Sequence, residues 1–535
     1  MKRPATWLAL TIALPAAAVI AGVLLSWLHT DTGLLTHLGR FVLPRVVGNT
    51  LVLVIGVAAL TSVIGVALAW LTAMYEFPGR RLFSWALLLP MAMPGYVIGF
   101  VFIGVFEYSG PLQGLLRSLT GTTESLIPIR STPGIIIVMS LALYPYVYLM
   151  ARNAFLTQGQ RAIEVAATLG LAPRAAFWRV ALPLARPWIA GGVLLVSMET
   201  LADFGTVSVF NYDTFTTAIY QAWFGLYSLT SALQLASVLL LIVFVVLIGE
   251  KKLRGRAGYA TGVSAARVRP LEGSQRWLAS AACLTVLAIG FGLPVVQLVA
   301  WTVTSWSAAY WTDFLRSGGQ SLLVALLAMS LTTAAAIGLV YARRAAPSPL
   351  VGAAVRVGTL GYALPGTILA VAIYSLLAAS NNALNTVVER LLGIDPGFFV
   401  QGTLLAMLIA LGVRFLAVAF QSVSNAMRRV SPHIDEASRS LGVTGMPLVR
   451  LVYLPLLRGG VLTASVLVFV DVMKEMPITL MTRPFGWDTL AVRVFEMTSE
   501  GQWERAALPA LAIAIVGLVP VIFIVRAASN APATR

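Results

Sequence analysis

Long apolar runs separated by short polar segments fill the chain from end to end. A run of about 20 apolar residues is long enough to cross the hydrocarbon core of a bilayer as a helix. Pro and Gly interrupt several runs, which bundled membrane helices tolerate. The pattern predicts an all-α polytopic membrane protein with about twelve spans. These lie at about residues 7–28, 48–73, 82–106, 134–154, 187–210, 229–249, 277–304, 319–342, 349–379, 397–421, 459–481 and 506–527.

The first apolar run is interpreted as a retained span. It is too long for a removed signal peptide and has no small-residue cleavage site. Lys and Arg are unevenly divided among the connecting segments, and an inner N-terminus places roughly three times as many of them inside as outside. We therefore predict that both termini are cytoplasmic. The net charge of +16 then reflects topology and attraction to anionic lipid headgroups, and not nucleic-acid binding.

Composition narrows the possible classes of protein. Hydrophobic residues make up 59% of the 535 residues and charged residues only 11%. Soluble domains are near a quarter charged, and disordered chains have low hydrophobicity, so both classes are excluded. Cys283 is the single cysteine and the three histidines are scattered, so the chain has no cysteine-based metal site and no paired-histidine motif. A metal site, if there is one, stays unknown at this point.

The two halves of the chain repeat each other at a nearly constant shift, which predicts a tandem duplication. Each half holds six spans, so both halves enter the membrane in the same direction as parallel repeats. We predict a first repeat over residues 1–250, a basic cytoplasmic linker over 251–275 and a second repeat over 276–535. The matching positions are Asn49-Thr50-Leu51 with Gln320-Ser321-Leu322, Pro94-Gly95 with Pro365-Gly366, Glu164 with Glu436, Gly170 with Gly442, Leu182-Pro183 with Leu454-Pro455, and Asp213-Thr214 with Asp488-Thr489.

One loop after the fourth span of each repeat carries the most informative motif. The loops, 160–186 and 432–458, each contain a Glu, a Gly six residues later and a Leu-Pro pair beyond it. We expect a short helix with an exposed glutamate, a turn at the glycine, and a second amphipathic helix that the proline stops. A helix of this kind at the inner membrane face suits the groove of a partner protein. The motif residues are Glu164, Gly170, Pro183, Glu436, Gly442 and Pro455.

This spacing resembles the EAA loop of ABC-importer permeases, although Val165 and Ser438 replace alanines of the motif. The stretches 200–225 and 470–501 are similar to those of fused two-domain iron(III) permeases. The resemblance implies the type I, MetI-like permease fold in a bacterial cytoplasmic (inner) membrane. It also implies that the six motif residues couple the chain to two copies of an ABC ATPase, and that a periplasmic or extracellular binding protein delivers the cargo.

ATP hydrolysis is not expected on this chain. None of its four lysines follows a glycine, so it has no phosphate-binding GK[ST] motif, and ATP and magnesium would bind the partner ATPase. The chain alone is therefore predicted to have no enzymatic activity and to need no cofactor. A secondary transporter with twelve spans remains an alternative. The two loops 160–186 and 432–458, called the docking loops below, argue against a secondary transporter, which has no need of paired docking helices. A membrane scaffold or receptor without transport activity is a further alternative.

Charged residues within the spans give a second candidate site. Glu199 and Asp203 in the fifth span correspond to Asp471 and Glu475 in the eleventh, which also carries Lys474. Ionised groups in a membrane cost roughly 2.5–3.5 kcal/mol each on insertion scales, so they usually face a partner or a water-filled path. We hypothesise that all five line the translocation path. The alternative is that Lys474 and Arg414 pair with the carboxylates and only lock helices together.

Carboxylates favour a cationic cargo. Iron(III) is a hard cation that prefers oxygen ligands, and excess carboxylate should repel oxyanions. We predict import of iron(III) by alternating access. The alternatives for cargo are thiamine, a phosphonate or a polyamine. Tyr212-Asp213 and Trp487-Asp488 lie near the outer ends of their spans, where they could meet a delivering protein or serve as interfacial anchors.

Overall fold

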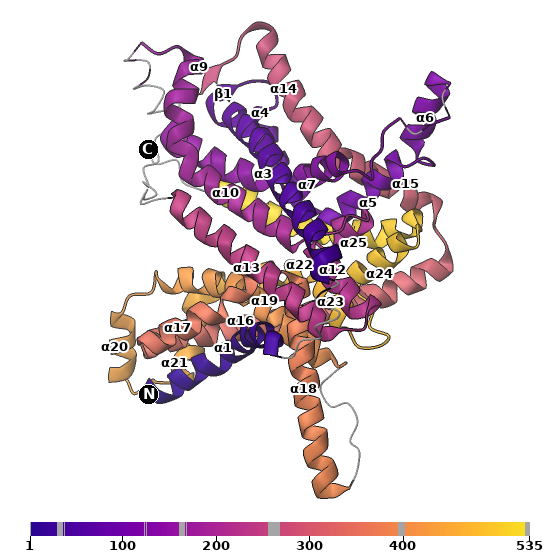
Figure 1. Ribbon diagram of the computed structural model, residues 1–535. Coiled ribbons are helices and arrows are strands. Elements are labelled where there is room, and N and C mark those ends of the chain that lie inside the picture. Colours follow the sequence, from indigo (N-terminus) through magenta and orange to yellow (C-terminus); the bar gives the residue numbers. More distant parts are fainter. Residues whose placement is uncertain are drawn as a thin grey trace. The chain divides into compact units, whose positions relative to one another are not determined.

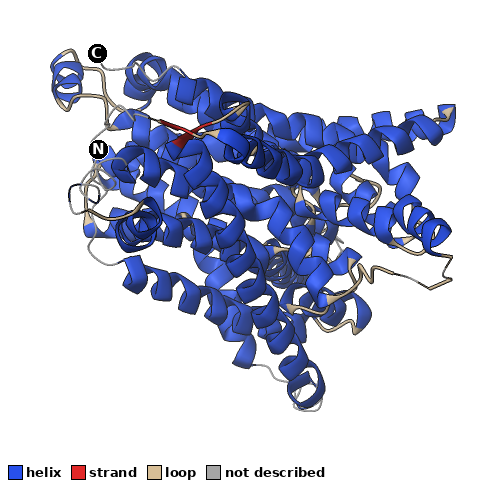
Figure 2. Cartoon of the chain, turned by 90° about the horizontal axis from the view of Figure 1, so that it is seen from above, coloured by secondary structure: helices blue, strands red, loops and turns tan. Residues whose placement is uncertain are grey.

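A computed structural model describes residues 2–28, 36, 38–121, 123–124, 126–159, 166, 168, 170–254, 268–393 and 402–529. The described chain is almost entirely helical (Figures 1 and 2). Twelve of its helical stretches are long and apolar enough to cross a membrane. The predicted all-α fold with about twelve spans is confirmed. Strands β1 (Tyr75–Glu76) and β2 (Arg269–Pro270) form one short parallel pair, seen in red in Figure 2.

Short 3₁₀ and π turns of this protein carry η labels. The first half contains the following helical elements. They are α1 (Lys2–Leu25), η1 (Ser26–Leu28), η2 (Leu38–Val42), α3 (Leu43–Met74), α4 (Arg80–Ala86), η3 (Leu89–Ala92), α5 (Gly95–Phe106), α6 (Pro111–Thr120), α7 (Thr132–Ala154), η4 (Phe155–Gly159), α9 (Pro173–Ala176), η5 (Phe177–Ala181), α10 (Leu182–Ala202), α11 (Gly205–Val209), α12 (Phe215–Tyr220), η6 (Gln221–Gly225) and α13 (Leu229–Arg254).

The helical elements of the second half run from α14 to α25. They are α14 (Gly273–Leu287), η7 (Ala288–Gly292), α15 (Leu293–Thr304), α16 (Ala308–Ala345), α17 (Pro349–Gly358), η8 (Leu360–Ala363), α18 (Gly366–Leu392), α19 (Leu404–Met427), α20 (His433–Ser440), α21 (Met446–Leu448), η9 (Val449–Tyr453), α22 (Leu454–Lys474), α23 (Pro477–Thr482), α24 (Leu490–Ser499) and α25 (Trp503–Ser529).

The chain divides into two compact units, and each draws on both halves of the sequence. Unit 1 comprises residues 1–39, 218–240 and 307–493, and unit 2 comprises 40–217, 241–306 and 494–535. The compact units therefore cut across the predicted repeats 1–250 and 276–535, because the first helix of each repeat and a segment near its end, 218–240 or 494–535, belong to the unit built on the other half. The predicted linker 251–275 falls largely on residues 255–267, outside the described residues.

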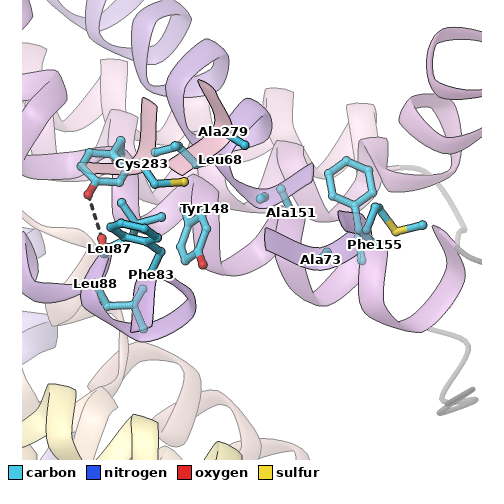
Figure 3. Packing of buried hydrophobic residues seen from close by; sticks show 14 of the residues in the cluster. Leu68, Ala73, Phe83, Leu87, Leu88, Tyr148, Ala151, Phe155, Ala279 and Cys283 are labelled. Atoms are coloured by element: carbon cyan, nitrogen blue, oxygen red, sulfur yellow. Dashed lines mark hydrogen bonds between the residues drawn. The ribbon is translucent and has the colours of Figure 1, made fainter. Parts of the chain in front are cut away.

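Three helices, α3, α7 and α10, form the core of unit 2. They approach closely at small residues, as membrane helices do. A Cβ on Gly65 would lie 2.9 Å from the Tyr148 backbone nitrogen, and one on Gly192 would lie 2.9 Å from the Val147 Cα. Tyr148 of α7, Phe155 of η4, Leu87 and Cys283 of α14 belong to one buried cluster (Figure 3). A helix from the second sequence half thus completes this core.

Unit 1 repeats this arrangement with α16, α19 and α22. A Cβ on Gly460 of α22 would lie 2.5 Å from the Ala426 Cβ of α19. Helix α1, from the first sequence half, packs on α16, α17 and α18, and an added Cβ on Gly338 would lie 3.0 Å from Ile12. The exchange of first helices is therefore reciprocal.

Polar contacts between matching positions reveal the duplication in space. In unit 2 the Phe215 amide donates to the Thr50 hydroxyl at 3.4 Å, and Asn49 donates to the Asp213 carbonyl at 3.0 Å. In unit 1 the Leu490 amide donates to the Ser321 hydroxyl at 2.7 Å. The Asp488 amide donates to the Gln320 side chain at 2.9 Å. Asp213 also pairs with Arg45 and Asp488 with Arg483, so both acids have partners in their own unit.

Some predicted span limits were wrong at breaks in the helices. The third and ninth spans were expected to be continuous over 82–106 and 349–379, but each is broken at its Pro-Gly pair. Helices α5 and α18 begin at the glycine of this pair. The fifth and eleventh end earlier than expected, α10 at Ala202 and α22 at Lys474. Proline lacks an N–H and clashes with a preceding helical turn, whereas a hydropathy average passes over such a break.

Candidate docking loops and intramembrane acids

The second docking loop is fully described and begins with helix α20 of unit 1 (Figure 1). Asp435 and Glu436 lie in its first turn, where the helix dipole favours negative charge. The Glu436 side chain is 71% exposed, and its carboxylate lies 3.2 Å from His433 Nδ1. This glutamate is therefore accessible to a partner protein.

Gly442 ends α20 in a left-handed turn. Its φ is 74°, its N–H donates to the Arg439 carbonyl, and the Val443 N–H donates to the Ser438 carbonyl at 2.8 Å. This pair of hydrogen bonds is the Schellman motif, which favours glycine. A Cβ at Gly442 would meet nothing within 4 Å, so the backbone conformation, and not space, requires the glycine. The turn exposes Leu441, whose side chain is 79% accessible.

A half-buried polar network that the sequence analysis missed anchors α20 to the membrane helices of unit 1. Arg344 Nε of α16 lies 2.7 Å from Asp435 Oδ2, and the Tyr453 hydroxyl donates to Asp435 Oδ1 at 2.9 Å. Arg344 also donates to three carbonyls in the segment that leads into α20. No sequence spacing joins Arg344 to Asp435, because the two residues are 91 positions apart.

The first docking loop shares the turn of the second. Gly170 has a φ of 71°, and the Leu171 N–H donates to the Ala166 carbonyl at 2.9 Å. These positions match Gly442, Val443 and Ser438. Glu164 lies outside the described residues, as do its neighbours in 160–165, so its accessibility stays a prediction.

The Leu-Pro pairs do not stop a helix, contrary to the prediction. Pro183 and Pro455 lie at the start of α10 and α22, and a π turn runs directly into each helix. The Leu182 N–H donates five residues back to the Phe177 carbonyl, and the Leu454 N–H does so to Val449. Because proline has no N–H to donate, the wider π turn absorbs the missing bond and the helix continues.

Asp203 follows the last residue of α10 and caps the next short helix. Its carboxylate accepts hydrogen bonds from the Thr206 hydroxyl at 2.8 Å and from the Val207 amide at 3.1 Å. A Cβ on Gly95, the first residue of α5, would lie 3.6 Å from Asp203 Oδ1. In the part of the chain that the structure describes, Asp203 forms no ion pair with Lys or Arg.

Glu475 occupies the matching place after α22, but it is neutralised. Its Oε2 lies 3.2 Å from Arg414 Nε, and the two side chains are only 7% and 13% exposed. Glu475 Oε1 accepts from the Ile478 amide at 3.2 Å, and a Cβ on Gly366 would lie 2.8 Å from this oxygen. Arg414 also donates to the Leu364 carbonyl. This contact pattern is the one expected of the helix-locking alternative.

The other three charged residues lie on the preceding helices. Glu199 of α10 and Asp471 and Lys474 of α22 are half-buried, and each interacts with other groups. Among the described residues, no three His, Cys, Asp or Glu side chains gather closely enough to hold a metal ion.

Comparison with known proteins identifies a family domain in the first half. Residues 62–249 match the family described as binding-protein-dependent transport system inner membrane component. This stretch includes the first docking loop and Asp203, with their helices α7 and α10.

Relatives extend the likeness over the rest of the chain. The Fe(3+)-transport system permease protein FbpB 2 of Haemophilus influenzae is 29% identical, over 97% of this chain and 98% of its own length. The ferric transport system permease protein FbpB of Actinobacillus pleuropneumoniae is 25% identical, over 82% of this chain and 64% of its own. The sulfate transport system permease protein CysW of Escherichia coli K12 is 34% identical, but only over 28% of this chain and 49% of its own.

Proposed function

Because the chain belongs to the binding-protein-dependent inner-membrane permeases of ABC importers, with two permease domains fused in one polypeptide, we propose that it imports iron(III). The observation that supports this cargo most strongly is the match to a ferric-ion permease along nearly the whole length of both chains. The match to a sulfate permease covers about a quarter of the chain and supports the shared machinery more than a shared cargo.

The two docking loops would receive two ABC ATPase subunits. The exposed Glu436 and Leu441 and the matching glycine turns at 170 and 442 support this role. Closure of the ATPases would move the loops, and through them α10 and α22, whose first turns form the ends of the loops. A binding protein outside the membrane would deliver the cargo, and both termini would lie in the cytoplasm. ATP and magnesium would bind the ATPases.

The intramembrane acids would act on the cargo at the far ends of α10 and α22. Glu199 lies in the last turn of α10 and Asp203 directly follows this helix, and Asp203 has no Lys or Arg partner among the described residues. A carboxylate without a compensating cation, such as that of Asp203, attracts a hard metal ion and repels sulfate. Weak or shared ligands let an ion leave again, so conduction does not need a tight cage.

Uptake of labelled iron(III) by energised cells tests the cargo and the coupling together. Cells that lack the chain are complemented with the wild type, with a double variant Glu164→Ala and Glu436→Ala, or with Glu389→Ala, which removes an exposed acid from α18. We expect iron uptake with the wild type and with Glu389→Ala, and its loss with the double variant. Persistent uptake in the double variant would favour a secondary transporter.

A parallel measurement with labelled sulfate separates the two cargo classes. Sulfate uptake without iron uptake would overturn the iron proposal and keep the ABC architecture. A second double variant, Glu199→Gln with Asp471→Asn, tests the path. We expect it to reduce iron uptake at a normal amount of protein in the membrane. Unchanged transport would remove both acids from the path.

A further inference from the structure

A cavity of about 530 Å³ lies within unit 1, between α19 and α22. Ile434 of docking helix α20 forms part of its wall, so the cavity borders the second docking loop. Besides the apolar side chains of Ala426, Val430 and Leu456, its lining contains hydroxyl, amide and guanidinium groups and two adjacent glycines. The polar residues and the glycines are Ser422, Asn425 and Arg429 of α19 and Gly459, Gly460 and Thr463 of α22.

The two glycines have different parts in forming this cavity. A Cβ on Gly460 would lie 2.5 Å from the Ala426 Cβ, so this glycine lets α22 approach α19 closely. A Cβ on Gly459 would meet nothing within 4 Å. Gly460 therefore allows close packing of the two helices, and Gly459 leaves the space beside them open.

The cavity face of α22 continues to the intramembrane charges. Leu456, which lines the cavity, and Lys474 are 18 residues apart, and at 3.6 residues per turn they point in the same direction. Thr463 and Asp471 lie within about 60° of that direction on the same helix. One side of α22 therefore runs from the cavity to the charged end.

The cavity face of α19 leads to the same region. Arg414 and Asn425 are 11 residues apart, about three turns, so both lie on one face of α19. Arg414 pairs with Glu475 directly after the end of α22. Two neighbouring helices thus present continuous faces from the intramembrane charges to the cavity beside the docking loop.

We propose that this cavity is the release chamber of the translocation path on the cytoplasmic side, an inference that rests on the proposed function. Ser422, Asn425 and Thr463 offer neutral oxygens, which a hard cation accepts as ligands. Neutral oxygens hold such an ion less strongly than carboxylates do, so the ion can leave. The exposed Arg429 adds a positive charge that weakens binding further. Because Ile434 lines the chamber, movement of the docking loop would change its width.

Cysteine labelling in the complete transporter tests the chamber. Thr463→Cys and Asn425→Cys are made separately, and the single native cysteine, Cys283, is buried and should contribute little background. The labelling rate is measured with a charged, membrane-impermeant thiol reagent added to inside-out membrane vesicles. Iron uptake is measured separately, in cells that carry the same variants, after the reagent is admitted to the cytoplasm. Leu462→Cys is the matched control, since Leu462 is exposed one residue from Thr463 and points about 100° away.

We expect both chamber cysteines to react, labelling to abolish uptake, and reaction to slow several-fold when the ATPases are trapped with ATP. Labelling at Leu462→Cys should leave uptake unchanged. Two results would overturn the chamber: labelled chamber cysteines with normal uptake, or cysteines that react only with a lipid-soluble reagent, which would mean that lipid fills the space. Absence of iron uptake by the wild type would reject the iron cargo alone, because ATP-dependent labelling needs no cargo.

Discussion

The turn after α10 and the turn after α22 use equivalent positions, but they differ in charge compensation. The Asp203 carboxylate accepts hydrogen bonds from the Thr206 hydroxyl and the Val207 amide and has no Lys or Arg partner among the described residues, whereas Glu475 forms a buried ion pair with Arg414. Arg414 has Ala142 as its counterpart at the shift of 272 that relates the two acids. Matching positions in a duplicated protein therefore need not share an electrostatic role: among the described residues, one half leaves its carboxylate without a cationic partner, and the other pairs its carboxylate with an arginine.

Removing Arg414 should produce the largest loss of stability. Arg414→Gln leaves Glu475 buried without its partner, and breaking a buried pair typically costs about 3–5 kcal/mol. We expect a clear fall in the thermal unfolding temperature of the protein purified in detergent. The double variant Arg414→Gln with Glu475→Gln should recover most of this loss, because no buried charge then remains. Asp203→Asn should cost about 1.5 kcal/mol or less, since it removes no ion pair.

The predicted difference between the two turns would be contradicted if Arg414→Gln and the double variant Arg414→Gln with Glu475→Gln lost the same amount of stability. An Asp203→Asn variant as unstable as Arg414→Gln would also contradict it. In either case the two turns would be electrostatically alike, and the assignment of Asp203 to the cargo would lose its structural support.

The docking loops give a second contrast. The second loop is fixed by Arg344, Asp435 and Tyr453. The counterparts of these residues in the first half carry no polar side chain. They are Ala73, Ile163 and Ala181, at shifts of 271 or 272. Hydrogen bonds to charged groups contribute roughly 1.5–3 kcal/mol. We therefore expect Asp435→Asn to weaken binding of the ATPase subunit about tenfold, because α20 loses its fixed orientation.

Binding of the purified ATPase to the detergent-solubilised permease measures this effect. Arg343→Gln is the matched control, as it removes an exposed charge beside Arg344. Asp435→Glu should restore part of the affinity, which a general loss of folded protein would not allow. If Asp435→Asn and Arg343→Gln bind the ATPase equally well, the network does not position the docking helix.

The sequence was sufficient for features set by composition and local pattern. Apolar runs predicted the spans, because only membrane helices need such lengths. The repeated Glu and Gly spacing predicted the positions of the docking turns, since a left-handed turn favours glycine. The acids Asp203 and Glu475 were identified because ionisable groups are rare in spans.

Features that depend on contacts between distant residues were not predictable in this way. The exchange of α1 and α14 between the two cores leaves no trace in hydropathy, since each helix is apolar wherever it packs. Arg344 and Asp435 pair across 91 residues, and Arg414 and Glu475 across 61. Continuity through Pro183 and Pro455 depends on π turns, which restore hydrogen bonding where a general rule predicts a stop.

The glycine turns are the feature that the two docking loops share, so they should respond alike. Gly170 and Gly442 have φ values of 71° and 74°, and neither would meet an atom within 4 Å of an added Cβ. A left-handed conformation costs a non-glycine residue about 1–2 kcal/mol, so Gly170→Ala and Gly442→Ala should each destabilise by that amount. Gly459→Ala is the control, since its open helical site should gain slightly from alanine. Thermal unfolding of the three variants measures the comparison, and unequal effects at 170 and 442 would mean that the loops differ in their turns as well as in their anchors.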